Sequence, residues 1–465
     1  MCNAFKKGEM RKHVKLRKIF TAFILGAVTA LSCACNIPFI GPKLPSYEEK
    51  DFVFFGFWSP YEFTAESYNL YKQSGLNTLF FTNHSVDNRT SDTLHYLGSN
   101  ATKKSLDLCK EVGLNAILNY GYWYKEAAEG KSFSDTPFSD YDIYGEYKDI
   151  IVGMHIADEP TIDQISDFGD DTLTSDFKSV YDVPYMVNMF PNYAGMFSIG
   201  PKGFRHYVQT HFDEIQADFD KNRLLSVDFY PFRDTGFHTS GLACYDDMAR
   251  VARDNDCMQS YYIQTAIGNE FQESLSQVEI RMQMDIAMAF GADWFGFYCY
   301  STPRTYKGDG SYYPMYEYCM LKPDGTPSPL YYYVQSEIAR ISAYSNVYLS
   351  YDWVKAIPVL EAGGEGSLEL LMLGDPDFSN TSLKSATASE DTVIGCFNSD
   401  NGEAFMVVNY GDTKTQRQSL VELEFLSGKR VAIYGEGEEP KIVKLKKGKL
   451  SLDIPVGAGY FITLL

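Results

Sequence analysis

Apolar runs of strand length recur along the first three hundred residues, separated by longer stretches with a helical pattern. The runs are continuous rather than alternating, as is typical of parallel strands covered on both faces. Eight of them can be distinguished: Phe52–Phe57, Thr78–Thr82, Ala116–Tyr120, Ile151–Ile156, Tyr185–Phe190, Leu224–Tyr230, Tyr261–Ala266 and Trp294–Tyr300.

The segments between these runs repeat one local pattern. Gly75, Gly113 and Gly291 each follow a helical stretch and precede an apolar run. Glycine suits the position just past a helix because it adopts the left-handed conformation without a Cβ penalty. The clearest helical periodicity spans Glu270–Phe290. The pattern is therefore helix, glycine, turn, buried strand, which is the second half of a βαβ unit.

Eight strands alternating with helices over about 250 residues predict a (β/α)8 TIM barrel. A doubly wound sheet is the competing fold, and it would usually show a glycine-rich phosphate turn after its first strand. The segment Phe57-Trp58-Ser59-Pro60 is not such a turn. The barrel is therefore the preferred α/β fold.

The pattern changes near residue 355, where short apolar runs alternate with Asn, Asp and Gly. Ser399-Asp400-Asn401-Gly402 contains the Asn-Gly signal of a tight hairpin. A length of about 100 residues is usual for a β-sandwich. We predict four parts: a signal peptide (1–35), a linker (36–50), the barrel (51–354) and a C-terminal all-β sandwich (355–465).

The N-terminal segment has the pattern of a secretory signal. Several Lys and Arg residues precede an apolar run, Ile19–Leu31, which is too short to span a bilayer. Small residues and two cysteines, Cys33 and Cys35, follow, and this arrangement resembles the lipobox of bacterial lipoproteins. Either cysteine fits as the lipid anchor, and plain signal cleavage is the alternative. The resemblance implies an extracytoplasmic protein anchored to the membrane by lipid alone.

The composition narrows the classes of molecule that the protein is expected to bind. The formal net charge is −20, which argues against nucleic acid, because binding to nucleic acid rests on Lys and Arg neutralising phosphates. Aromatic residues reach 15%, mostly Tyr and Phe, and suit flat amphipathic ligands such as sugars. The cysteines beyond Cys35 are dispersed, so no disulfide framework is expected.

Active sites of TIM barrels lie at the C-terminal ends of the strands, so the residues there are the candidates. They are aromatic rings, amides and carboxylates: Trp58, Asn83, Tyr120, Trp123, Asp158, Glu159, Asp228, Tyr230, Gln264 and Tyr298. Rings stack on the apolar faces of sugars, and the polar groups hydrogen-bond to hydroxyls. His84, His155 and His238 show no metal-binding spacing, and no phosphate-binding nest is present. We expect a carbohydrate partner and neither a metal nor a cofactor.

The segment Val152–Pro160 ends in Asp158-Glu159-Pro160 at the fourth predicted strand. Here the chain resembles the large superfamily of barrel glycoside hydrolases in which Asn-Glu-Pro ends strand 4, and its Asp-Glu-Pro form is similar to that of family-42-type β-galactosidases. The resemblance implies that Glu159 is the general acid/base. The alternative is that Asp158 and Glu159 only stabilise the start of the next helix.

The resemblance also implies a nucleophilic Glu at the end of strand 7, where this chain has Gln264. Three substitutes are open. Glu270 or Glu273 could reach back from the following loop, Asp228 could serve from strand 6, or the strand count could be wrong by one. We favour Asp228 because a strand end is held more rigidly than a loop. Glu270 and Glu273 fit better as the first turn of a helix.

The sequence thus predicts a glycoside hydrolase that cleaves a β-linked glycan by carboxylate acid/base catalysis. A rival hypothesis is a non-catalytic glycan-binding lipoprotein, a barrel that has lost its nucleophile, and Gln264 is the feature that favours it. A second rival is a structural surface protein whose β domain makes the contacts.

Overall fold

The computed structural model describes residues 44–81, 99–119, 146–169, 182–217, 219, 221–307, 311–363, 367–435, 437 and 439–465. The predicted signal segment with Cys33 and Cys35 lies outside these ranges. So do four residues expected at the C-terminal ends of the barrel strands: Asn83, His84, Tyr120 and Trp123. The barrel and the β domain both belong to one compact unit, Ser46–Leu465.

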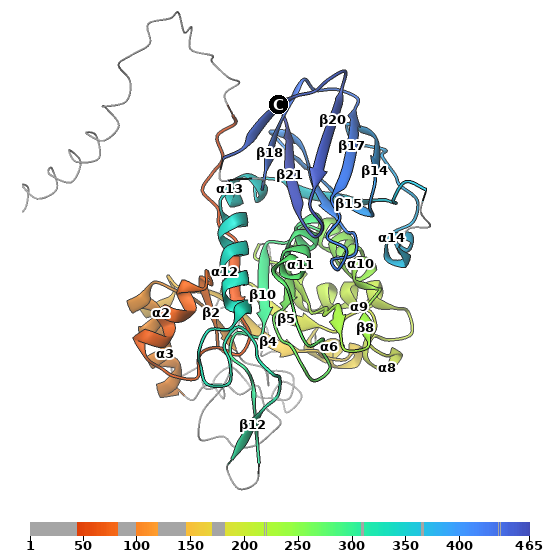
Figure 1. Ribbon diagram of the computed structural model, residues 1–465. Coiled ribbons are helices and arrows are strands. Elements are labelled where there is room, and N and C mark those ends of the chain that lie inside the picture. The colour runs from red at the N-terminus through yellow and green to blue at the C-terminus, as the bar shows by residue number, and fades with distance from the viewer. Residues whose placement is uncertain are drawn as a thin grey trace, which may run out of the picture. The chain divides into compact units, whose positions relative to one another are not determined.

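Eight parallel strands close into a barrel in the order β1-β10-β9-β6-β5-β4-β3-β2 (Figure 1). This confirms the predicted barrel. The strands are β1 (Val53–Gly56), β2 (Thr78–Phe80), β3 (Asn115–Asn119), β4 (Ile151–Asp158), β5 (Tyr185–Met189), β6 (Leu224–Val227), β9 (Met258–Gln264) and β10 (Trp294–Tyr298). Because β9 is the seventh barrel strand along the chain, the strand count was not wrong by one.

Helices occupy the connections between the strands. They are α2 (Ala65–Gln73), α3 (Ser99–Val112), α6 (Ile162–Gly169), α8 (Met196–Ile199), α9 (Phe204–His211) with the π-helical turn η2 (Phe212–Gln216), α10 (Gly241–Asp254), α11 (Gln277–Ala289), α12 (Pro329–Ser342) and α13 (Ser345–Tyr348). Gly75, Gly113 and Gly291 have positive φ angles of 93°, 74° and 88°, as their predicted helix-ending role requires. Over the described ranges, no helix combines the length and apolar character needed to cross a membrane.

The loops that follow the sixth and eighth barrel strands contain small antiparallel hairpins. The first pairs β7 (Phe232–Arg233) with β8 (Gly236–Phe237), and the second pairs β11 (Arg304–Tyr306) with β12 (Tyr312–Pro314). Both loops emerge from the C-terminal ends of barrel strands, so both can contribute to a site there.

The C-terminal domain consists of two antiparallel sheets, as predicted. A six-stranded sheet has the order β13-β15-β16-β21-β18-β19 and a three-stranded sheet the order β14-β17-β20. The elements are β13 (Asp352–Val359), α14 (Leu368–Met372), β14 (Leu383–Ala388), β15 (Thr392–Ser399), β16 (Gly402–Asn409), β17 (Ser419–Phe425), β18 (Arg430–Tyr434), β19 (Lys441–Lys444), β20 (Lys449–Ile454) and β21 (Gly459–Leu464). The predicted Asn-Gly hairpin joins β15 to β16, with Ser399 opposite Gly402.

Burial patterns explain how the β domain packs. β20 alternates exposed and buried residues, so one face of the three-stranded sheet meets the core and the other meets solvent. β15 and β16 have long runs of buried residues because the six-stranded sheet is covered on both faces. Its second face rests on the barrel: a Cβ at Gly395 would lie 2.2 Å from the carbonyl oxygen of Ala289 at the end of α11. Only glycine allows this approach.

A buried ion network fixes the β domain to the barrel helices. The Asp285 carboxylate of α11 accepts a hydrogen bond from Arg340 Nη2 of α12 at 2.6 Å and another from the backbone N–H of Gly459 at 2.7 Å. Arg340 also pairs with Glu337 at 2.7 Å, and Glu337 pairs with Arg281 at 2.8 Å. The side chains of Asp285 and Glu337 are fully buried, so each charge depends on its partner.

We expect Asp285→Ala to lower the free energy of unfolding by about 3–5 kcal/mol, because it removes one of the two buried carboxylates that pair with the Arg340 guanidinium. Lys384→Ala is the control, since it breaks the exposed pair with Glu424 and should cost no more than about 1 kcal/mol. Urea titrations followed by circular dichroism measure both. Equal losses for the two variants would contradict the assignment of Asp285 to a buried network.

Candidate functional site

A pocket of about 230 Å³ lies at the C-terminal ends of the barrel strands. Residues that follow β1, β4, β5, β6, β9 and β10 all contribute to its wall. The lining residues are Phe57, Asp158, Glu159, Asn188, Tyr193, Asp228, Tyr230, Arg233, Tyr262, Glu270, Phe271, Tyr298 and Tyr316. The pocket therefore brings together four carboxyl groups, an arginine and a group of aromatic rings.

Glu159 follows directly after β4 and is held by its backbone. Its N–H donates to the carbonyl oxygen of Asn188 on β5 at 2.8 Å, and Tyr207 of α9 donates to the carbonyl oxygen of Pro160 at 2.6 Å. The φ angle of Glu159 is +45°, a conformation that side-chain-bearing residues rarely adopt. The neighbouring strand and helix thus impose a strained backbone that turns this carboxyl group into the pocket.

Burial among other acids perturbs three of the carboxyl groups. It raises the pKa of Glu159 to about 7, with the negative charge of Asp158 adding to the rise and the positive charge of Arg233 opposing it. Burial also raises the pKa of Asp158 to about 6, against a 3.1 Å hydrogen bond from Asn188. The pKa of Asp228 is raised well above its usual range by burial and by Glu159 and Asp158. Near neutral pH a large share of Glu159 is therefore protonated and Asp228 favours its neutral form, whereas a pKa of about 6 leaves most of Asp158 charged.

Glu270 reaches the pocket from the loop after β9. Its carboxylate accepts a hydrogen bond from the Tyr316 hydroxyl at 3.0 Å, and that hydroxyl lies 3.1 Å from the hydroxyl of Tyr298. Gly268 and Asn269 have positive φ angles and turn the chain back towards the barrel, where Phe271 forms a β-bridge with Arg233. The prediction that Glu270 lies in a helical first turn was wrong.

Glu270 lies outside the helix because α11 begins later in the chain. Ser276 caps α11 and forms a reciprocal capping box with Glu279, so the helix begins at Gln277 rather than near Glu270. The residues before it are free to follow the barrel rim. Glu273 is exposed and lies outside the pocket lining.

Aromatic rings form one side of the pocket. The Tyr298 ring lies 5.0 Å from that of Tyr230, and the Phe271 ring stacks on that of Tyr316 at 5.3 Å. The Arg233 guanidinium lies 5.0 Å from the centre of the Phe271 ring. Flat apolar faces next to carboxyl groups suit a ligand with an apolar face and polar edges, as a sugar ring has.

Two predicted rim residues lie elsewhere. The Gln264 side chain is fully buried, and its amide donates to the carbonyl oxygen of Phe232 at 2.8 Å and accepts from the Phe232 N–H at 3.0 Å. The loop after β6 thus folds over the end of β9 and removes Gln264 from the ligand surface. Trp58 is half-buried, its ring packs edge-on against Phe57 at 6.2 Å, and it lies outside the pocket lining.

Of the residues expected at the rim, the structure brings Asp158, Glu159, Asp228, Tyr230 and Tyr298 into one pocket, together with Glu270. Sequence reasoning missed others, chiefly Tyr193, Arg233, Phe271 and Tyr316. Arg233 follows Asp228 by five positions and Phe271 follows Glu270 directly, so proximity could have indicated both. Nothing in the sequence indicates Tyr316, which comes back from the far end of the last loop.

The histidine on β4 lies in the barrel interior. His155 is fully buried on β4, its Nδ1 lies 3.0 Å from the Asn119 side-chain oxygen, and burial lowers its pKa to about 3. It is therefore a neutral interior histidine at physiological pH. In the part of the chain that the structure describes, no group of three His, Cys, Asp or Glu residues has the arrangement of a metal site.

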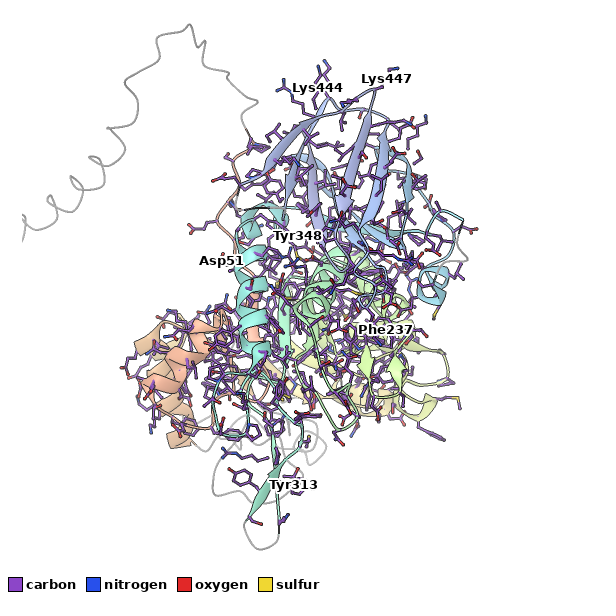
Figure 2. All side chains as sticks on the ribbon, viewed as in Figure 1. Asp51, Phe237, Tyr313, Tyr348, Lys444 and Lys447 are labelled. Carbon is purple, nitrogen blue, oxygen red and sulfur yellow. The ribbon has the colours of Figure 1, made fainter. Side chains whose placement is uncertain are left out.

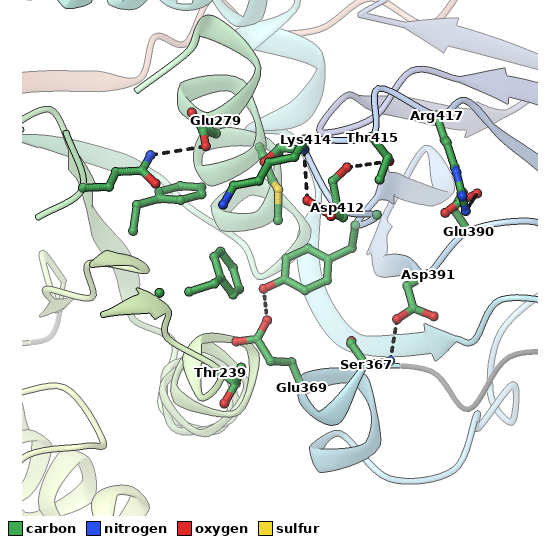
Figure 3. Close-up of a pocket in the computed structure, with 18 of the residues that line it drawn as sticks. Thr239, Glu279, Ser367, Glu369, Glu390, Asp391, Asp412, Lys414, Thr415 and Arg417 are labelled. Carbon is green, nitrogen blue, oxygen red and sulfur yellow. Dashed lines mark hydrogen bonds and ion pairs between the residues drawn. The ribbon is translucent and has the colours of Figure 1, made fainter. Parts of the chain in front are cut away.

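A second pocket, of about 820 Å³, lies between the barrel and the β domain (Figure 3). Several of its charged groups are engaged in structural contacts. Glu369 accepts from the Gly241 N–H at 3.1 Å and from the Tyr410 hydroxyl, and Asp391 accepts from the Ser367 N–H at 2.6 Å. We therefore place the candidate site in the smaller pocket, where the carboxyl groups face the cavity at the strand ends.

No protein-family model matches the sequence, and no curated protein matches it. Solved structures match the fold. A family-42 β-galactosidase from G. stearothermophilus, in the form of a catalytic mutant, is 9% identical, with 90% of this chain and 99% of that chain covered at a TM-score of 0.50. An α-amylase from Malbranchea cinnamomea is 9% identical, with 89% and 96% covered at 0.46. A family-30 endoxylanase from Clostridium papyrosolvens is 11% identical, with 90% and 97% covered at 0.40. The chain is thus similar in fold to barrel glycoside hydrolases.

Proposed function

We propose that this protein is a glycoside hydrolase that cleaves a β-linked glycan, with Glu159 as general acid/base. The observation that supports this most strongly is the raised pKa of Glu159, about 7, in a pocket that also contains Glu270 and a wall of aromatic rings. A glycosidase needs one protonated carboxyl group for the leaving oxygen and one charged carboxylate on the other side of the sugar. The pocket offers groups suited to both roles.

We assign the second carboxylate to Glu270 rather than to Asp228. The raised pKa of Asp228 favours its neutral form, which can neither attack the anomeric carbon nor deprotonate a water molecule. Glu270 accepts a hydrogen bond from Tyr316, an arrangement that supports a negative charge on the carboxylate. This reverses our preference from the sequence. It also weakens the case for a binding protein without a nucleophile, because Gln264 is engaged with Phe232 and Glu270 supplies a carboxylate.

The reaction then follows from these two groups. Glu159 donates its proton to the glycosidic oxygen as the bond to the anomeric carbon breaks. Glu270 either forms a covalent bond to that carbon or activates a water molecule to attack it. In the covalent route Glu159, now an anion, then accepts a proton from the water molecule that releases the sugar from Glu270; in the other route Glu270 itself accepts the proton of the attacking water. Aromatic rings such as Tyr298 would stack on the sugar.

The test is hydrolysis by the full chain of a panel of aryl β-glycosides, β-linked disaccharides and soluble β-glycans. We expect release of the aglycone or of reducing ends from at least one member. Proton NMR of the first-formed anomer then distinguishes retention, in which Glu270 is the nucleophile, from inversion, in which it is the base. Saturable glycan binding without turnover would instead support the binding protein.

The positive charge of Arg233 should set the upper pH limit of the reaction. Because Arg233 lowers the pKa of Glu159, Arg233→Gln should raise it and move the basic limb of the kcat/KM profile upward by about 0.5–1 pH unit, the size expected for loss of one nearby charge. The matched control is Arg233→Lys, which keeps the charge and should leave the limb near pH 7. A limb that stays in place in Arg233→Gln would exclude Glu159 as the titrating acid.

For the predicted N-terminal signal we propose lipidation at Cys33 or Cys35 and attachment to the outside of a membrane. The support is the sequence pattern alone, because both cysteines lie outside the described residues. Blocking lipoprotein signal processing with globomycin should cause a larger precursor to accumulate. An unchanged size and unchanged membrane attachment would contradict the anchor.

A further inference from the structure

Large apolar side chains are exposed in two loops that also contribute residues to the candidate pocket. We call Met196 and Phe197 the β5 patch, with 63% and 92% of their surface exposed. We call Tyr312, Tyr313 and Met315 the hairpin patch, with 45%, 49% and 38% exposed. Single exposed apolar residues are ordinary, but grouped ones commonly indicate an interaction surface. Both patches are short in sequence and adjoin residues of the pocket wall.

The β5 patch belongs to the loop that follows the fifth barrel strand. Tyr193, in the same loop, lines the pocket and accepts a hydrogen bond from Arg233 at 2.8 Å. The short helix α8 then begins at Met196, and its last residue, Ile199, is buried. Because Ile199 anchors this turn to the protein, Met196 and Phe197 are held outward. The patch therefore stands in the same loop as a residue of the pocket wall, beginning three positions after Tyr193.

The hairpin patch belongs to the loop that follows the eighth barrel strand. Tyr316, the next residue after Met315, lines the pocket and donates to Glu270. The base of the hairpin is held by a hydrogen bond from the Met315 N–H to the Pro303 carbonyl at 2.8 Å. The Arg304 guanidinium lies 4.0 Å from the Tyr61 ring centre and 4.6 Å from that of Tyr312, which stiffens the hairpin against the rim.

The topology places these two loops on different sides of the pocket. In the closed barrel, β5 and β10 are separated by β6 and β9, so the loops that follow them leave the ring at well-separated points. Figure 1 shows α8 and the β12 hairpin at two distinct positions on the barrel, and Figure 2 shows Tyr313 on the hairpin strand. Tyr193 and Tyr316 connect each patch to the same pocket.

We infer that the substrate is a polymeric glycan that crosses the pocket and is cleaved internally, with sugar units resting on the β5 patch and on the hairpin patch. The inference rests on the proposed function, which it makes more specific. Aromatic and methionine side chains can cover the apolar faces of sugar rings without demanding particular hydroxyl positions, as flat rings do for other stacked ligands. A substrate limited to one or two sugars would fill the pocket and leave both patches unused.

The test uses Phe197→Ala, Tyr313→Ala and the double variant in the full chain. For each variant, kcat/KM is measured on whichever of soluble mixed-linkage β-glucan, glucomannan, galactan or xylan the wild type hydrolyses, and on an aryl glycoside of the same sugar. We expect the ratio of kcat/KM on the polysaccharide to kcat/KM on the aryl glycoside to fall about 3–10-fold for each single variant and more for the double variant. Tyr332→Ala, which removes an exposed tyrosine from α12, is the matched control and should leave the ratio unchanged.

A second measurement separates this inference from the proposed function. In a Glu159→Gln background, native gels containing the same polysaccharides should show retarded migration that the double variant abolishes. Loss of retardation without hydrolysis by the wild type would support glycan binding by the patches and refute the hydrolase. Hydrolysis with an unchanged ratio in the double variant, or release of single sugars without a fall in polymer viscosity, would overturn the inference. So would a double variant that only converts a dimer to a monomer in sedimentation, because the patches would then bind a second copy.

Discussion

Glu159→Gln is expected to lower kcat on an unactivated β-glycoside by at least ~10²-fold, and up to about 10⁴-fold, while the protein remains folded. The amide has the shape of the protonated carboxyl group but cannot donate a proton to the leaving oxygen with comparable ease. The loss should be smaller for a dinitrophenyl glycoside, whose leaving group needs little protonation. Steady-state kinetics on both substrates, with circular dichroism as the folding check, measure the effect.

The pH dependence gives an independent check on the same residue. The acid must be protonated to act, so wild-type kcat/KM should fall as the pH rises through the Glu159 pKa of about 7. In Glu159→Gln this limb should disappear. Asp163→Asn, which changes an exposed acid on the helix after Glu159, is the matched control and should behave like the wild type. Equal losses on good and poor leaving groups would indicate that Glu159 is not the proton donor.

Glu270→Ala is expected to reduce kcat by ~10³-fold or more, because it removes the carboxylate that we assign to the anomeric carbon. Asp228→Asn should cost less than about tenfold, since an amide resembles the neutral carboxyl group that its raised pKa favours. Glu273→Gln, a change three residues away on an exposed side chain, should be silent. Kinetics on one activated aryl glycoside compare all three variants.

Azide distinguishes the role of Glu270 from that of a binding residue. In a retaining enzyme, the space left in Glu270→Ala should admit azide, which attacks the anomeric carbon and gives a glycosyl azide of inverted configuration, with partial recovery of the rate. The same product from Asp228→Ala, with none from Glu270→Ala, would assign the nucleophile to Asp228. Inversion without an azide adduct would make Glu270 the base for water.

The strand ends illustrate how far the sequence could determine the site. Glu159 was predictable because it directly follows a strand whose continuous apolar run is visible in the sequence, and the backbone of a barrel strand fixes where its end lies. Glu270 comes six residues after the end of β9, and its position depends on the turn at Gly268 and Asn269 and on the bridge between Phe271 and Arg233. The sequence could name it only as an alternative.

Gln264 was expected to contact the ligand, but the structure buries its side chain. It stands at a strand end, as Glu159 does, and the sequence therefore placed it at the ligand surface. The loop after β6 folds over that end, and the backbone of Phe232 forms hydrogen bonds with the amide. Tyr316 reaches Glu270 from the hairpin loop in the same way, over a separation of 46 residues. Such contacts depend on how loops cross one another, which no local pattern records.

The sequence by itself determined the eight-stranded barrel, its glycine-ended helices and the β domain that follows, because each depends on local hydrophobic periodicity and on backbone conformations that few residues accept. It also determined that carboxylates and aromatic rings lie at the strand ends. Only the tertiary structure decided which of them share one cavity, and it raised the pKa of Glu159 by burying it beside Asp158. Burial and electrostatic coupling arise between segments that are distant in the chain, so they exist only once the barrel has closed.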